Sequence, residues 1–74
     1  MTDATRITRD PNVMGGKPCI RGMRVTVGTI VGLLSARRTP AEILRAYPYL
    51  EAGDIDAALA YAAWRCEEYE VPAA

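Results

Sequence analysis

Apolar residues recur at the spacing of an α-helix between residues 27 and 36. The positions that repeat every three or four residues are Val27, Ile30, Val31 and Leu34. Thr26 stands immediately before them and is a good N-cap, because its hydroxyl can accept a hydrogen bond from the free backbone N–H groups of the first turn. Two basic residues follow the last turn, where the negative end of the helix dipole favours positive charge. The pattern therefore predicts a helix over residues 27–36.

A shorter helix is predicted over residues 39–47, with an apolar stripe made by Ile43, Leu44 and Tyr47. Thr39 and Glu42 have the spacing of a capping box, in which each side chain accepts a hydrogen bond from the backbone N–H of the other residue. Pro48 ends the helix, because the residue before a proline avoids the helical conformation. A helix this short is not stable alone. We therefore expect it to be held between two longer helices and to form a tight helix–turn–helix pair with the first.

The longest helix is predicted over residues 52–69, with Asp54 and Asp56 in its first turn, where the dipole favours negative charge. Its expected core stripe is Ile55, Ala58, Leu59, Ala62 and Cys66, and a second apolar stripe is Ala57, Tyr61 and Trp64. A helix that is apolar nearly all round is usually buried on more than one side. We therefore expect Tyr61 and Trp64 to form a partner interface, in a homodimer or with another protein. The alternative is that both rings fold back over the chain's own core.

Short strands are predicted before the first helix. The candidates are residues 6–9, 19–20 and 23–25, with Arg21-Gly22 as a two-residue turn between the last two. Such strands are too short to be stable alone, so they have to pack on the helices or pair with a second chain. The expected fold is mainly α: a single domain over residues 6–70, with an N-terminal β-hairpin followed by three helices, and flexible tails at 1–5 and 71–74.

The composition excludes several classes of protein. The chain has 74 residues, half of them hydrophobic, which suits one small folded domain. Neither a signal peptide nor a membrane-spanning apolar run is present in the sequence, so we expect a cytoplasmic protein. There is no histidine, and the two cysteines, Cys19 and Cys66, lie far apart. We therefore expect both cysteines to be reduced and packed, and we expect no metal site.

No group of residues has the pattern of a catalytic site. No nucleophile lies beside a base and the carboxylates form no acid–base pair, so an enzyme is the class least expected. Gly15-Gly16-Lys17 has the composition of a phosphate-binding loop, but a proline follows the lysine where the nucleotide-binding pattern needs Ser or Thr. We therefore expect no cofactor and no small-molecule substrate.

Opposite charges gather in the two halves of the chain, although the net charge is zero. Residues 1–38 have seven basic and two acidic residues, whereas residues 39–74 have two basic and seven acidic ones. This asymmetry indicates either a charged partner on one face or charges that mix on the folded surface. If the chain binds DNA, its basic half has to do so, because phosphates repel the acidic third helix. The candidate DNA contacts are Arg21, Arg24, Arg37 and Arg38. The alternative for the first two is pairing with Asp10 or with the third helix.

Two runs of the chain together resemble a known family. The more specific one is Gly16-Lys17-Pro18-Cys19-Ile20-Arg21-Gly22, followed by Arg24-Val25. The other is Thr39-Pro40-Ala41-Glu42-Ile43-Leu44, followed by Tyr47-Pro48 and Asp54-Ile55. From Ile7 to about Cys66 the chain resembles the domain-of-unknown-function family 433. The resemblance implies a homeodomain-like helix–turn–helix fold and an antitoxin-like protein of the VapB type, whose partner is a PIN-like ribonuclease toxin and which has operator DNA as a second target.

Three residues depart from the family pattern. Met23 stands where the family usually has threonine. Arg37 stands near the usual glycine of the first helix–helix turn, so we expect an arginine in a left-handed conformation, at some cost in free energy. Glu51 replaces the usual Ser or Thr cap of the third helix, which should weaken the start of that helix.

Three classes of function follow from the resemblance and the residues. The first is an antitoxin of a bacterial toxin–antitoxin module, and the alternatives are a homodimeric DNA-binding regulator without a toxin and a small scaffold module. For the antitoxin, we expect arginines to neutralise the carboxylate-lined active site of the nuclease, because a guanidinium pairs with carboxylates in a bidentate way. The rival expectation is that helix packing alone holds the toxin.

Overall fold

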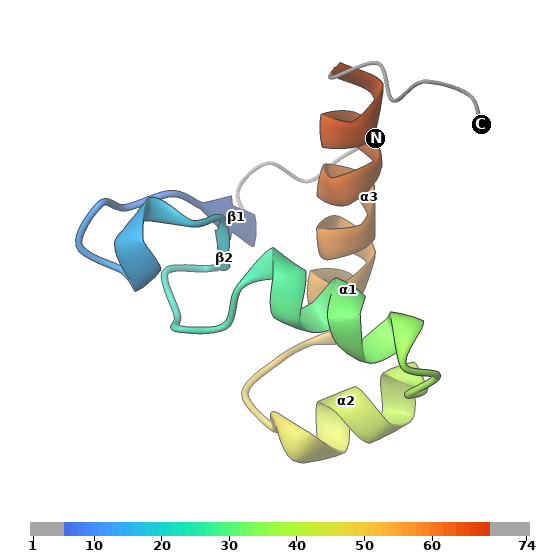
Figure 1. Cartoon of the computed structure of the whole chain (residues 1–74). Helices are drawn as coiled ribbons and strands as arrows, with labels where there is room; N and C mark the ends of the chain where they lie inside the picture. Colours follow the sequence, from blue (N-terminus) through green and yellow to red (C-terminus); the bar gives the residue numbers. More distant parts are fainter. Residues whose placement is uncertain (1–5, 69–74) are drawn as a thin grey trace.

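The computed structural model describes residues 6–68, so the predicted tails 1–5 and 71–74, and residue 69 of the predicted third helix, lie outside the described residues. The elements follow in the order β1 (Ile7–Thr8), the short 3₁₀ turn η2 (Met14–Gly16), β2 (Cys19–Ile20), α1 (Val27–Ser35), α2 (Pro40–Ala46) and α3 (Ala52–Glu68). The fold is therefore mainly helical with short N-terminal strands, as predicted. Figure 1 shows α1 crossing the first turns of α3 and α2 lying below the start of α3, whose last turns project away from both.

The two strands form an antiparallel ribbon in which Ile7 lies opposite Ile20 and Thr8 lies opposite Cys19. After β2 the chain reverses at Arg21-Gly22, where both residues have positive φ, 45° and 73°, as a two-residue hairpin turn requires. The predicted strand 23–25 is not formed. The backbone returns only as far as a bond from Ile20 N to Val25 O and an isolated bridge at Thr26, because Thr26 already serves as the cap of α1.

The first two helices begin as their capping residues predict. The Thr26 hydroxyl accepts from Thr29 N at 3.0 Å. At α2 the Thr39 hydroxyl accepts from Glu42 N at 3.1 Å, and the Glu42 carboxylate accepts from Thr39 N at 2.9 Å, which completes the capping box. These hydrogen bonds, first of all the one from the Thr39 backbone, lower the pKa of Glu42 below its usual value. The Glu42 carboxylate is therefore fixed at the start of α2.

The turn between α1 and α2 has an arginine in a left-handed conformation, as the departure from the family pattern predicts. Arg37 has φ 68°, and its N–H donates to Leu34 O while Arg38 N donates to Leu33 O, both at 3.0 Å. This pair of bonds is the Schellman motif, which normally has glycine at the left-handed position. The closed end of α1 directs the chain back along α2.

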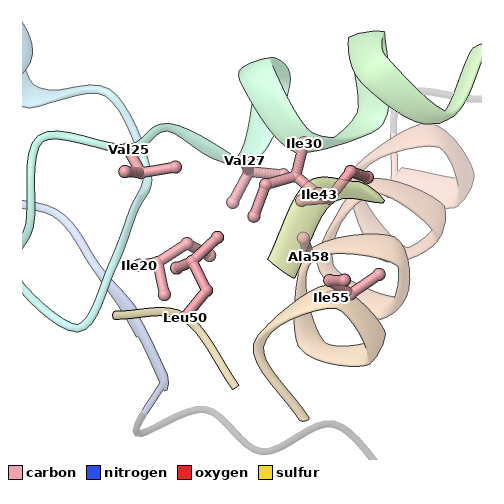
Figure 2. Packing of buried hydrophobic residues seen from close by; sticks show 8 residues of the cluster. All are labelled: Ile20, Val25, Val27, Ile30, Ile43, Leu50, Ile55 and Ala58. Atoms are coloured by element: carbon pink, nitrogen blue, oxygen red, sulfur yellow. The ribbon is translucent and has the colours of Figure 1, made fainter. Parts of the chain in front are cut away.

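A small core is shared by all parts of the ribbon and the three helices. Figure 2 shows its eight residues: Ile20, Val25, Val27, Ile30, Ile43, Leu50, Ile55 and Ala58. Val31, Leu34, Leu44 and Tyr47 pack against it from the predicted stripes of α1 and α2. A cluster of this size has little redundancy, because each segment of the chain contributes only one or two side chains to it.

The core stripe predicted for α3 is wrong at two positions. Ile55 and Ala58 are buried and Ala62 packs against the core, but Leu59 is 45% exposed and Cys66 is exposed. The helix is rotated so that Ala57 and Ala58 face inward, which turns Leu59 outward, one residue further round the helix. Of the two cysteines expected to be packed, only Cys19 is buried.

Because Arg37 has a left-handed conformation, we expect glycine to stabilise the protein relative to alanine at this position, although glycine usually destabilises a helix. Arg37→Gly should be more stable than Arg37→Ala by about 1 kcal/mol, because glycine adopts this conformation without the steric cost that alanine retains. At Ser35, the last residue of α1, Ser35→Gly should instead be less stable than Ser35→Ala by about 0.5 kcal/mol. Urea unfolding measures both pairs, and equal stabilities of the two Arg37 variants would contradict the strain.

Candidate functional site

Asp54 is the one buried charged residue among residues 6–68, and its side chain is fully shielded from solvent. It lies in the first turn of α3. Four hydrogen bonds surround its carboxylate: Oδ1 accepts from Arg6 Nη1 at 2.8 Å and Arg21 Nε at 3.1 Å, and Oδ2 accepts from Arg21 Nη2 at 2.9 Å and Glu51 N at 2.8 Å. Every lone-pair direction of the carboxylate is thus used, which is what a buried charge requires.

The two arginines come from the N-terminal ribbon. Arg6 precedes β1 and also donates to the Glu51 carboxylate at 2.8 Å, while its guanidinium lies against Gly53, where an added Cβ would stand 2.8 Å from Arg6 Cζ. Arg21 lies in the turn after β2, and its Nη2 also donates to the backbone oxygen of Tyr49 at 3.0 Å. The network, defined as Arg6, Arg21, Glu51 and Asp54, therefore joins the ribbon, the α2–α3 loop and α3.

Opposing effects act on the ionisation of Asp54. Burial raises the pKa of its carboxyl, but the hydrogen bonds from Arg21, from the Glu51 backbone and from Arg6 outweigh burial, so that its pKa lies below the usual value. Hydrogen bonds to the carboxylates also raise the pKa values of both guanidinium groups. For Arg6 the bond to Glu51 has the largest effect, followed by the bond to Asp54, and for Arg21 the bond to Asp54 has the largest effect. The Asp54 carboxylate therefore stays ionised. The sequence predicts that Glu51 weakens the start of α3, but in the structure its backbone N–H donates to the Asp54 carboxylate, which caps this end of the helix.

The network holds Arg21, one of the four candidate DNA contacts, in an ion pair within the domain. Arg21 was expected to face a partner or, alternatively, to pair with the third helix, and the structure has it paired with Asp54 of α3. Arg24, Arg37 and Arg38 are exposed. Arg38 makes a 3.9 Å ion pair with Glu42. Because α1 separates Arg24 from the other two by about 14 Å of helix, the four arginines are not gathered in one patch (Figure 1).

The two residues of the predicted partner interface differ in environment. Tyr61 is half-buried and packs against the core, whereas Trp64 is 51% exposed, and their ring centroids lie 5.8 Å apart. The Arg65 guanidinium lies 5.6 Å from the centre of the Trp64 ring. The folding-back alternative is thus realised for Tyr61 but not for Trp64. Together with the exposed Leu59, Trp64 forms an outward surface that we call the α3 apolar face: Leu59, Ala60, Ala63 and Trp64.

Other kinds of site find no support in the part of the chain that the structure covers. Within residues 6–68, no three His, Cys, Asp or Glu side chains gather where they could hold a metal ion. None of the helices described is both long enough and apolar enough to cross a lipid bilayer. The surfaces that remain for function are the α3 apolar face and the exposed arginines.

Sequence reasoning missed Arg6, the burial of Asp54 and the outward position of Leu59. Asp54 has the ordinary signature of a first-turn acidic residue, which stabilises a helix whether or not the residue is buried. The signal that was available is the position of Arg6 and Arg21 beside Ile7 and Ile20, since these two apolar residues anchor the strands in the core.

Removal of the central charge should cost much of the stability of this domain. Asp54→Asn leaves two guanidinium groups facing a neutral amide, and the breaking of a buried ion pair costs about 3 kcal/mol, out of a total of about 5 kcal/mol for a small domain. Asp56→Asn, two residues along the same helix and exposed, is the matched control and should change stability by less than about 0.5 kcal/mol. Equal urea midpoints for the two variants would show that the network is dispensable.

Acid should unfold the protein through the same carboxylate. The pKa of Asp54 is lower in the folded than in the unfolded chain, so its contribution is complete above the unfolded value of about 3.9 and is lost as the pH falls from there through the folded value. In Arg21→Gln the hydrogen bonds weaken while burial persists, so Asp54 contributes less stability at neutral pH and the acid unfolding midpoint should lie at a higher pH. Circular dichroism of the unfolding transition between neutral and acidic pH follows this shift, and Asp56→Asn should leave it where it is in the wild type.

Comparisons with known proteins give the family. The family model described as "Protein of unknown function (DUF433)" matches residues 7–62. The uncharacterized protein y4eO of Sinorhizobium fredii is 36% identical over 56 residues, which cover 76% of this chain and 25% of that protein. The crystal structure of a DUF433 member from Anabaena variabilis superposes with a TM-score of 0.80 at 33% identity, over 89% of this chain and 65% of that one.

This chain therefore spans about a quarter of the curated relative, so what the relatives do as whole proteins does not transfer directly. The matched residues include Arg21, Glu51 and Asp54 of the network and all of α1 and α2. Since the family model covers most of its length and a solved member has the same fold, this chain belongs to the DUF433 family of proteins of unknown function.

Proposed function

We propose that this chain is an antitoxin-like protein that binds a PIN-like ribonuclease through the α3 apolar face and acts in the cytoplasm. The observation that carries the proposal is the exposure of Trp64 (51%) and Leu59 (45%) on α3, five residues apart, whereas Ile55 and Ala58 of the same helix lie in the core. Tryptophan and other large apolar side chains exposed in this way dominate the energetics of protein interfaces. The partner's identity comes from the family resemblance.

The α3 apolar face has the form of an interface for a protein more than for a nucleic acid. Leu59, Ala60, Ala63 and Trp64 carry no charge, and Ala60 and Ala63 let a partner backbone approach closely between the two larger side chains. Asp56, one turn before them, adds a negative charge at the edge and would repel phosphates. A second copy of the chain can use the same face, so a homodimer in the absence of the nuclease belongs to this proposal.

Fewer arginines are available for a partner than the sequence suggests. Arg21 is held by Asp54, so the guanidinium groups that can enter a carboxylate-lined pocket are those of Arg24, Arg37 and Arg38. These three groups also favour operator DNA as a second target, because guanidinium groups that keep donors free bind phosphates. In that case binding should weaken with salt by about one unit of logarithmic slope for each arginine that contacts a phosphate.

The test is inhibition of a PIN-like nuclease encoded beside this chain's gene. Trp64→Ala and Leu59→Asp should each weaken binding by about 30-fold or more, which is the cost of truncating or charging an interface hot spot. Met14→Ala is the control, because Met14 is also an exposed large apolar residue, at 38%, but lies in η2, away from α3. Titration calorimetry with purified nuclease measures the affinities, and circular dichroism verifies that the variants remain folded.

Two outcomes would refute the proposal. If the wild-type chain neither binds nor inhibits the neighbouring nuclease, the antitoxin function is wrong. If binding survives both α3 variants but is lost in Arg24→Ala or in the double variant Arg37→Ala/Arg38→Ala, the partner is held by the arginines and the α3 apolar face has been misassigned.

A further inference from the structure

A groove runs along the end of the molecule formed by α2 and the last turn of α1. It is open to solvent and has a volume of about 370 Å³. Its floor is apolar and comprises Leu33 from α1 and Ile43, Ala46 and Tyr47 from α2 and its C-cap. Ile43 is buried, whereas Ala46 is exposed and Leu33 and Tyr47 are half-buried, so the floor is a continuation of the core that reaches the surface.

Two guanidinium groups stand at the rim of this groove. They belong to Arg38, in the α1–α2 turn, and to Arg45, in the last turn of α2, and both side chains are exposed. Within residues 6–66, no acidic side chain forms an ion pair with Arg45. Arg38 faces Glu42 at 3.9 Å, a distance too long for a hydrogen bond. The other carboxylate oxygen of Glu42 accepts from Thr39 N, so this carboxylate also serves the capping box.

The rim therefore carries a net positive charge, with two guanidinium groups against the single carboxylate of Glu42, directly beside an apolar floor. The floor is also rigid, since the ring of Tyr47 meets that of Tyr49 edge to face, with centroids 6.1 Å apart and an angle of 75° between the planes. A fixed apolar floor between two guanidinium groups is complementary to a side chain such as leucine that is flanked by carboxylates.

We propose that this groove binds an acidic segment of the partner protein, with an aliphatic or aromatic side chain on the floor and carboxylates at Arg38 and Arg45. The partner is the one in the proposed function, and the inference rests on it to that extent. A phosphate backbone is a poorer match, because it has no apolar group for the floor. The groove lies at the end of α1 opposite to Arg24. It is also distant from the projecting end of α3 (Figure 1). One partner can therefore occupy both the groove and the α3 apolar face only if it extends around the domain.

Three blocked tripeptides test the groove without the partner protein. Each has a central leucine, flanked by two glutamates, two glutamines or two lysines, and each is titrated into the ¹⁵N-labelled full chain. The glutamate peptide should shift the amide resonances of Ala46 and Tyr47 and the Nε resonances of Arg38 and Arg45. It should bind about threefold to tenfold more tightly than the glutamine peptide, since exposed ion pairs are individually weak, and the lysine peptide should bind least.

Variants of the two rim arginines distinguish a charge effect from non-specific binding of the peptides. Arg38→Gln and Arg45→Gln should each reduce the preference for glutamate over glutamine, and the double variant should abolish it. Arg24→Gln removes an equally exposed arginine outside the groove and should change nothing. All three positions are on the surface, so the variants should fold as the wild type does.

The outcomes decide between the occupants. Equal binding of the three peptides, or shifts that avoid the groove, would overturn the proposal, as would a single-stranded deoxythymidine oligonucleotide that shifts the rim arginines while the glutamate peptide does not. Because no nuclease is present, a failure here leaves the proposed function standing. Conversely, a failure of the α3 variants to weaken nuclease binding leaves the peptide result unaffected.

Discussion

The fold depends on one buried carboxylate. The core of this domain has only eight side chains, drawn from six segments of the chain, and a cluster so small does little to select one arrangement of short strands on helices. Asp54 adds that selection. Its four hydrogen bonds can be satisfied only when the ribbon, the α2–α3 loop and the start of α3 meet at one point. Buried ionic groups contribute little net stability by themselves, but an unpaired one is costly, so the network penalises every other packing.

The same network determines which charges remain for a partner. The sequence separates seven basic residues in its first half from seven acidic ones in its second, and the fold brings part of each set together. Arg6 and Arg21 neutralise Glu51 and Asp54 within the domain. The exposed basic side chains that remain include Arg9, Lys17, Arg24 and Arg37, and Arg38 and Arg45 stand beside an apolar floor. The charges still favour an anionic partner. The structure favours binding at Arg38 and Arg45, whereas the sequence indicates the ribbon turn at Arg21.

The longest helix performs two tasks along its length. Its first three turns supply Asp54, Ile55 and Ala58 to the network and the core, whereas its later turns extend beyond α1 and α2 and carry Trp64 outward (Figure 1). Arg65 packs over the Trp64 ring, and this cation–π contact helps to order the exposed aromatic side chain. Because the ordering cost is met before binding, such a surface is suited to partner recognition.

Interactions within a few residues could be predicted from the sequence, and those between distant segments could not. The capping box at Thr39, the cap at Thr26, the hairpin turn at Gly22 and the left-handed Arg37 all follow from neighbours no more than five positions apart, so their physics is present in the linear pattern. The Asp54 network joins residues 33 and 48 positions apart. The exposure of Leu59 depends on the rotation of α3, which the packing of Ala58 in the core decides. A first-turn aspartate and a helical leucine have the same local signature on either face of a helix, and only the tertiary structure chooses the face, because burial is a property of the assembled segments.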